Sequence, residues 1–240
     1  MRSDSIVSQY AHRFTDMTYA VKEIFYTLQG EGANTGRPAV FLRFAGCNLW
    51  SGLEGDRDKG QGGCSRWCDT NFVGTDGAAG GKFRSAEELA NAVKTLWPRP
   101  NPSKGLHRAE SRTTPFVVCT GGEPLLQLDE PLVAAFNDMG WSVAVETNGT
   151  IEPPSRDLWL TVSPKANATL KVFFGNEIKL IFPQTQAEPE RFEDLDFEHF
   201  FLQPLGGPQA AEHTEQALEY CLTHPQWRLS LQTHKILRIP

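Results

Sequence analysis

Short apolar runs alternate with polar, glycine-bearing segments along most of this chain. The runs are rich in β-branched and aromatic residues, a composition that favours strands. They predict strands over residues 19–28, 39–45, 116–119, 141–145, 158–162, 177–182, 200–202 and 228–231. The glycine-rich stretch 71–83 predicts a flexible connection.

Helical periodicity marks fewer segments. Ser85 stands at the capping-box spacing from Glu88, directly before an apolar stripe, and predicts the start of a helix. A second helix is predicted over residues 129–139, closed by Gly140, and a third over residues 214–222. Because strands and helices alternate, the pattern favours an α/β fold. The helices are too few for eight βα units, so we expect an incomplete TIM-like barrel of about six or seven mostly parallel strands.

Polar residues follow strand after strand. They are Q-G-E-G (29–32), T-G-G-E-P (120–124), E-T-N-G (146–149), S-P-K (163–165), Q-P (203–204) and Q-T-H (232–234). In α/β barrels the C-terminal ends of the strands form the rim that binds ligands. The pattern therefore predicts one shared binding mouth, although each segment by itself is also compatible with an ordinary turn.

Composition and charge narrow the class of protein. The chain has 240 residues, a 40% hydrophobic share and a formal charge of −6, which argue for a globular protein and against a general nucleic-acid binder. No apolar run reaches the roughly 20 residues that cross a bilayer, and the N-terminus lacks a signal-peptide core. We expect a flexible leader over residues 1–16, a single domain over residues 17–240, no membrane contact, and a cytoplasmic location.

Three of the five cysteines lie in one polar loop. Sixteen residues separate Cys47 from Cys64, and three separate Cys64 from Cys68. Cysteines in a loop favour a soft metal, and three thiolates suit an iron–sulfur cluster with one open iron. Structural zinc sites usually have four ligands. A disulfide is disfavoured because the count is odd and no secretory signal is present.

Two alternatives remain open for this loop. A histidine from elsewhere, His199, His213 or His234, would complete a Cys3His zinc site, or the thiols are free. The remaining cysteines, Cys119 in an apolar strand and Cys221 on a helix face, are expected to be buried small hydrophobes.

Arg43 is the only charge inside the apolar run 39–45. A buried or half-buried arginine needs an anionic partner. The residue therefore predicts an anion-binding position, unless it points to water from an edge strand.

Eight motifs in order carry a family resemblance. They are L-Q-G-E-G, R-F-A-G-C-N-L-W, C-D-T-N-F-V-G-T-D-G, V-C-T-G-G-E-P, E-T-N-G, V-S-P-K, F-L-Q-P and the final Q-T-H-K-I-L-R-I-P. Over residues 18–240 the chain resembles the radical S-adenosylmethionine superfamily and, within it, the 7-carboxy-7-deazaguanine synthase family. The superfamily's usual spacing is C-x3-C-x2-C, so both gaps are longer here. This departure leaves the geometry of residues 65–67 open.

The resemblance implies a set of cofactors. A [4Fe–4S] cluster would be held by Cys47, Cys64 and Cys68, and Mg2+ by Thr70. S-adenosylmethionine would contact Trp67, Asp69, Gly121, Gly122, Glu123, Ser163, Pro164, Lys165, Gln203, Pro204, Leu205 and Gly206.

It also implies a reaction and its partners. The substrate would be 6-carboxy-5,6,7,8-tetrahydropterin, which loses ammonia in a radical ring contraction to 7-carboxy-7-deazaguanine. It would contact Leu28, Gln29, Gly30, Glu31, Arg43, Thr120, His234 and Pro240. An electron donor such as flavodoxin or ferredoxin and a homodimer are implied as well. The competing functions are an activase that abstracts hydrogen from a partner protein and a zinc-stabilised binding module.

The sequence stops at I-L-R-I-P, which ends in Pro240 and comes after a predicted strand and Q-T-H. A carboxylate there would accept two parallel hydrogen bonds from a pterin edge. The alternative is a frayed apolar end.

Overall fold

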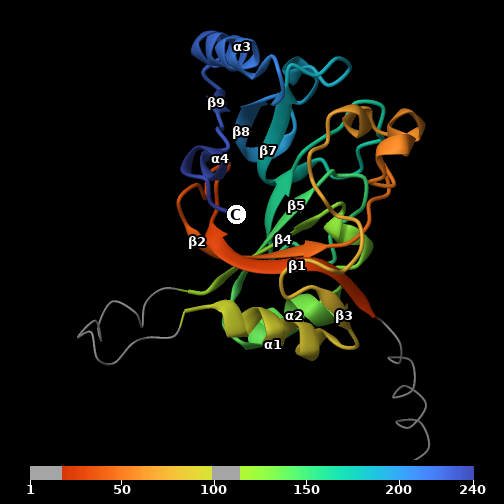
Figure 1. Cartoon of the computed structure of the whole chain (residues 1–240). Helices are drawn as coiled ribbons and strands as arrows, with labels where there is room; N and C mark the ends of the chain where they lie inside the picture. Colours follow the sequence, from red (N-terminus) through yellow and green to blue (C-terminus); the bar gives the residue numbers. More distant parts are fainter. Residues whose placement is uncertain (1–17, 99–113) are drawn as a thin grey trace, which may run out of the picture.

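The described residues form one nine-stranded sheet with few helices (Figure 1). The structure is a computed structural model and describes residues 18–98 and 114–240, so the predicted leader 1–16 lies outside it. The strands are β1 Tyr19–Leu28, β2 Pro38–Phe44, β3 Gly81–Phe83, β4 Phe116–Gly121, β5 Ser142–Thr147, β6 Trp159–Val162, β7 Phe174–Phe182, β8 Asp196–Pro204 and β9 Trp227–Leu229. The α-helices are α1 Ala86–Leu96, α2 Glu130–Asp138, α3 Ala210–Thr223 and α4 Thr233–Leu237. No helix in residues 18–98 and 114–240 is long and apolar enough to span a bilayer.

The sheet order is β3-β1-β2-β4-β5-β6-β7-β8-β9. From β2 to β9 every neighbouring pair is parallel, whereas β1 is antiparallel to both β2 and β3. The α/β class and the incomplete TIM-like barrel are therefore confirmed. The predicted six or seven mostly parallel strands correspond to the parallel part, and the antiparallel β1 and β3 extend it at one edge. Residues 71–83 do not form only a connection, because they end in β3.

Side chains on the convex face of the sheet form the main core. In Figure 1, α1 and α2 lie against the part of the sheet built from β1 to β5, and α3 lies beside β8 and β9. Alternate strand residues point to these helices, as the period of two requires. The fully buried members of this core include Ile24, Leu42, Leu89, Leu132, Phe136, Ile178, Leu180 and Leu202.

The concave face changes character along each strand. A second, smaller core near the strand starts contains Ala39, Phe41, Phe116, Val118 and Ala144. Two residues further along, the same face carries polar side chains: Arg43 on β2, Thr120 on β4 and Glu146 on β5. The concave face thus has an apolar floor and a polar mouth.

The predicted helix boundaries are largely confirmed. The Ser85 hydroxyl accepts a hydrogen bond from the Glu88 N–H at 3.2 Å and caps α1. Asp129 caps α2 in the same way, and Gly140 follows that helix with φ +74°. The short helix α4 was not predicted.

One loop fills the gap between the two ends of the sheet. We call residues 29–36, between β1 and β2, the closing loop. Its Gly32 N–H donates to the Ser230 hydroxyl at 3.0 Å, and its Ala33 N–H donates to the Glu177 carboxylate at 2.8 Å. A Cβ on Gly30 would overlap the ring of His234, so glycine allows the close approach.

Candidate functional site

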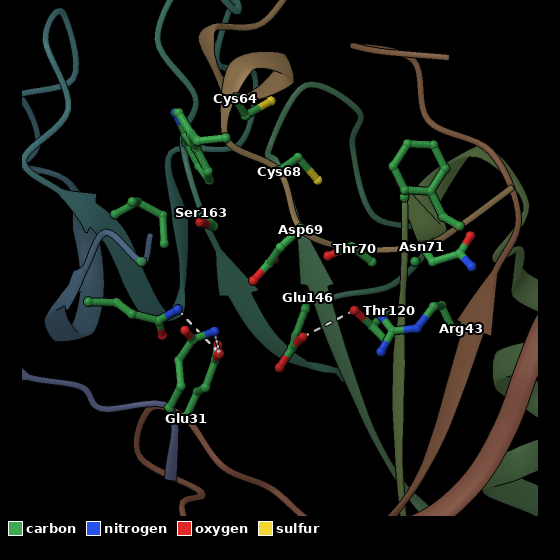
Figure 2. Close-up of a pocket in the computed structure, with 18 of the residues that line it drawn as sticks. Glu31, Arg43, Cys64, Cys68, Asp69, Thr70, Asn71, Thr120, Glu146 and Ser163 are labelled. Carbon is green, nitrogen blue, oxygen red and sulfur yellow. Dashed lines mark hydrogen bonds between the residues drawn. The ribbon is translucent and has the colours of Figure 1, made fainter. Parts of the chain in front are cut away.

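A cavity of about 930 Å³ lies on the concave side of the sheet, at the C-terminal ends of the parallel strands. All predicted site residues line it except Glu123 and Pro164. Figure 2 shows Cys64 and Cys68 at one end of this cavity, Glu31 at the other, and Thr120 and Glu146 between them. The predicted meeting of the strand ends at one mouth is therefore seen in the structure.

The cysteine loop holds its three thiols at the cavity wall. Cys47 follows β2, and Cys64 lies in a 3-10 helix, Gly63–Arg66. The Cys64 carbonyl accepts hydrogen bonds from the Trp67 N–H at 3.0 Å and the Cys68 N–H at 2.7 Å. The extra residue between the last two cysteines is thus absorbed in one helical turn.

Arg57 supports this loop from within. Its guanidinium donates to the Ser65 carbonyl at 2.7 Å and to the Cys68 carbonyl at 3.3 Å, and it lies 4.6 Å from the ring centroid of Trp50. The long insertion between the first two cysteines therefore folds back onto the turn that carries the second and third.

The electrostatics of the thiols favour a positively charged guest. Burial raises the pKa of Cys64 to about 11; the nearby Lys165 lowers it, and Cys68 and Cys47 raise it again. Burial also raises the pKa of Cys47, although the N–H groups of Leu49 and Trp50 oppose the shift. Negative charge on Cys47 and Cys68 thus opposes ionisation of Cys64, and a metal cation bound by the thiolates would remove that cost.

The side chains of the described residues do not form a closed site for a single zinc ion. Sulfurs around one tetrahedral zinc, at about 2.3 Å each, stand roughly 4 Å apart. Within residues 18–98 and 114–240, no three His, Cys, Asp or Glu side chains gather closely enough to hold one ion. His213 Nδ1 instead lies 2.8 Å from the Leu205 carbonyl oxygen, and His199 lies between Trp159 and Phe201.

The glycines after β4 allow close packing beside the thiols. A Cβ on Gly122 would overlap the backbone just before the first cysteine.

Glu123 lies beneath the cavity and is fully buried. Its carboxylate accepts hydrogen bonds at 2.8–3.0 Å from Leu125, Thr147 and Asn148. Glu123 thus joins the ends of β4 and β5, and burial raises its pKa.

The S-P-K and Q-P segments form another wall. The Lys165 ammonium donates to the Ser163 hydroxyl at 2.5 Å and lies 5.8 Å from the ring centroid of Trp67. Burial lowers the pKa of Lys165. Pro164 faces a second cavity of about 410 Å³ instead. On β8, the buried amide oxygen of Gln203 has no hydrogen-bond partner among the described residues, so it is available to a donor in the cavity.

A buried ion pair forms the far end of the cavity. Glu31, from the closing loop, pairs with Lys179 on β7, and Gln203 and Gln232 donate to the other carboxylate oxygen at 3.2 and 2.9 Å. Burial alone would raise the pKa of Glu31, but the Lys179 ammonium, the Gln232 amide and the charge of His234 lower it to about 2. The carboxylate is thus held ionised inside the protein.

Glu146 connects this end to the centre of the cavity. It accepts hydrogen bonds from the Gln29 amide at 2.9 Å and from the Thr120 hydroxyl at 3.1 Å (Figure 2). Neither Glu146 nor Lys179 was among the predicted site residues. Lys179 stands among apolar residues in the predicted strand 177–182, which also contains Glu177, and Glu146 opened a polar segment at a strand end.

The remaining predicted residues lie at the mouth and along one side. Arg43 pairs with Glu23 at 2.8 Å, so this arginine has an anionic partner within the chain.

Asp69 pairs with Lys235 of α4 at 2.7 Å, beside Thr70. The Pro240 carbonyl oxygen accepts a hydrogen bond from the Thr27 hydroxyl at 2.9 Å. As predicted, Cys119 is buried in the main core, whereas Cys221 was predicted to be buried and is only partly buried at the edge of that core.

Comparisons with known proteins place this arrangement in context. No family model matches the chain. It is 57% identical over 224 residues to the 7-carboxy-7-deazaguanine synthase of Bordetella pertussis, covering 93% of this chain and 100% of that protein. The corresponding protein of Bacteroides thetaiotaomicron is 36% identical with the same coverage. The crystal structure of QueE from Escherichia coli superposes with a TM-score of 0.63 at 28% identity, covering 97% of this chain and 99% of that one.

Proposed function

Since this chain belongs to the 7-carboxy-7-deazaguanine synthase family, we propose a role for each part of its cavity in that synthesis. It is a radical S-adenosylmethionine enzyme of the lyase class that makes a precursor of queuosine. The reaction converts 6-carboxy-5,6,7,8-tetrahydropterin to 7-carboxy-7-deazaguanine with loss of ammonia. One observation carries the assignment of roles: the three thiols and the polar strand ends line one cavity.

Cys47, Cys64 and Cys68 would hold the cluster. The convergence of three otherwise free thiols on the cavity wall supports this assignment. When bound, the cluster and S-adenosylmethionine supply the radical that starts the ring contraction. The N–H donors at Cys47 Sγ would offset negative charge on that sulfur.

The wall beside the cysteines would bind S-adenosylmethionine. Gly121 and Gly122 expose backbone groups next to Cys47, and Lys165 offers a half-buried cation to a carboxylate. Trp67, Asp69, Ser163 and residues 203–206 line the same space. Glu123 and Pro164, which do not line the cavity, would act by holding the strand ends.

The opposite end would bind the pterin. An ionised Glu31 accepts hydrogen bonds from guanidine-like N–H groups, because Lys179 keeps both of its oxygens unprotonated. Arg43 would pair with the substrate carboxylate, and Thr120 and residues 28–30 would contact the ring edge. His234 and Pro240 would complete the pocket, and the Thr27–Pro240 hydrogen bond supports the position of Pro240.

Several further features are part of the proposal. Thr70 would give its hydroxyl oxygen to Mg2+, which takes few protein ligands. An electron donor such as flavodoxin or ferredoxin and a homodimer are proposed from the family. The five free cysteines support a reducing, cytoplasmic location. The continuous sheet from β1 to β9 supports a single domain within residues 17–240.

Product formation tests the proposed function. The purified protein is loaded anaerobically with iron and sulfide and incubated with reductant, S-adenosylmethionine, Mg2+ and the carboxytetrahydropterin. Mass spectrometry should detect 7-carboxy-7-deazaguanine, and the Cys64→Ala protein should form none. A cluster-loaded protein that cleaves S-adenosylmethionine yet leaves the pterin intact would overturn the substrate assignment.

A further inference from the structure

A β-bulge interrupts β1 close to the cavity. Val21 faces Phe44 of β2, and Glu23 faces Arg43, the preceding residue of β2. Two steps along β1 therefore match one step along β2, with Lys22 as the extra residue. Bulges of this kind bend a strand and re-aim its side chains, often beside active sites.

The bulge decides which face Glu23 occupies. Val21 and Ile24, three residues apart, both point into the core under the helices. In a regular strand, residues two apart share a face, so Glu23 would join Val21 in that apolar core. Because of the extra residue, Glu23 and Phe25 instead point into the cavity.

A glycine-rich loop holds the bulge in place. We call residues 73–80 the clamp loop. Gly77 donates its N–H to the Lys22 carbonyl at 2.9 Å, and the Ile24 N–H donates to the Ala78 carbonyl at 2.8 Å. The Lys22 ammonium reaches Asp76 at 2.6 Å. A Cβ on Gly77 would lie 2.6 Å from the Lys22 carbonyl oxygen and 2.8 Å from the Cβ of Glu23, so a side chain there would displace both the bulge and Glu23.

Glu23 in turn fixes the guanidinium of Arg43. It accepts a hydrogen bond from Arg43 Nε at 2.8 Å, and the ring of Phe25 lies 5.9 Å from the guanidinium carbon. Phe25 itself stacks on Phe41 at 5.4 Å. A planar guanidinium held at Nε keeps its two terminal nitrogens free to bind a carboxylate in parallel. Figure 2 shows the Arg43 side chain reaching towards Thr120 and Glu146.

We propose that Glu23 is a positioning residue that aims Arg43 at the substrate carboxylate, and that the clamp loop serves the reaction by holding Glu23 on the cavity face. The inference rests on the proposed function, since it requires the carboxylated pterin as ligand. It assigns the V-G-T-D-G part of the sequence a task in substrate orientation. Glu23 has two opposite effects on substrate binding. It orients Arg43, which favours binding, but its own carboxylate repels the carboxylate of the substrate.

A comparison of two ligands, the pterin with and without its carboxylate, distinguishes a positioning role of Glu23 from a general structural role. Anaerobic calorimetry compares the carboxytetrahydropterin with the same tetrahydropterin lacking the carboxylate, on cluster-loaded protein with S-adenosylmethionine. Glu23→Ala should weaken binding of the carboxylated ligand about tenfold and change binding of the other less than about twofold. Glu23→Gln keeps an acceptor for Arg43 Nε and should restore most of the affinity. In an Arg43→Ala background, Glu23→Ala should have no further effect.

Matched variants complete the experiment. Gly77→Ala should reproduce the Glu23→Ala pattern in weaker form, whereas Glu188→Ala, which removes an exposed carboxylate near Arg191, should change neither ligand's affinity. Equal weakening of both pterins, or tighter binding of the carboxylated one, would overturn the positioning role while leaving the proposed function intact. If the unaltered protein bound neither pterin, the substrate assignment would fail, and this inference with it.

Discussion

The two faces of the sheet are made by alternate residues of the same strands, yet they differ in kind. The convex face is apolar along its whole length and is covered by α1, α2 and α3. The concave face is apolar only near the strand starts, and towards the strand ends it carries Arg43, Glu146 and Lys179. The convex face can supply most of the folding free energy through burial. The concave face holds charged groups whose burial is costly unless they are paired.

The difference between the two faces predicts which residues affect the stability of the fold and which affect ligand binding. A residue on the convex face should change the free energy of unfolding and leave ligand binding alone. A residue on the concave face should change binding, and should change stability only where it belongs to a buried charge pair. Cysteines on each face give the sharpest test.

Cys64→Ala, at the cavity wall, should abolish turnover. The loss of one of three thiolates should remove most of the iron, because the remaining donors cannot hold a cluster. Iron content, absorbance near about 400 nm and product formation are the measurements. Cys119→Ala on the convex face is the matched control; it should cost about 1 kcal/mol of stability and keep both iron and turnover. Full iron content and full activity in the Cys64→Ala protein would contradict the role given to the cavity wall.

Lys179→Met should destabilise the protein by about 3–5 kcal/mol at about pH 7, because Glu31 is left buried without its cation. In the unaltered protein, the pKa of Glu31 is lowered from 4.5 to about 2, so its contribution to stability is complete above about pH 4.5 and is lost as the pH falls towards 2. In the variant, burial without Lys179 raises this pKa, so the carboxyl is stabilising when protonated.

The stability gap between the two proteins should therefore shrink from about pH 7 to about pH 4, as measured by urea unfolding. Glu31→Gln with Lys179→Met should recover much of the loss, because the unpaired buried charge is gone. A gap that stays constant with pH would contradict the role given to this pair.

Leu132→Ala, on α2 against the convex face, should lower the free energy of unfolding by about 2–5 kcal/mol, because a buried leucine leaves a cavity. Calorimetry at low temperature, where the variant stays folded, should give unchanged affinities for S-adenosylmethionine and the pterin. A large loss of pterin affinity in a folded Leu132→Ala protein would mean that the two faces are coupled.

Thr70→Ala should have the smallest effect, a several-fold rise in the Mg2+ concentration needed for half-maximal turnover, because water can replace one hydroxyl ligand. Iron content should stay unchanged, which separates this residue from its neighbour Cys68. An identical Mg2+ titration curve would remove Thr70 from the metal site.

The convex face is the part that local sequence patterns predict best. Its apolar runs located eight of the nine strands in the described residues, and the capping residue Ser85 located the start of α1. Polar strand ends predicted the shared mouth, because parallel strands deliver their C-terminal ends to one rim.

Features that depend on tertiary contacts were missed. The strand β3 is short and glycine-flanked, and it exists because it pairs with β1. The bulge at Lys22 leaves no local signal, since it is set by the clamp loop more than fifty positions further along the chain. Glu23 was missed for that reason: the period of two assigns it to the wrong face.

The cysteine loop has a consequence for how such proteins vary in evolution. Closing a flexible loop of sixteen residues costs roughly 1.5 kcal/mol more than closing one of three, because the entropy grows only with the logarithm of length. The hydrogen bonds and stacking of Arg57 offset a cost of this size. An insertion of this length therefore costs little stability when its own contacts offset the entropy of closing the loop. The position of the three thiols at the cavity wall matters for the cluster, and the number of residues between Cys47 and Cys64 matters less. A sequence search that requires a fixed number of residues there will miss relatives with a different spacing.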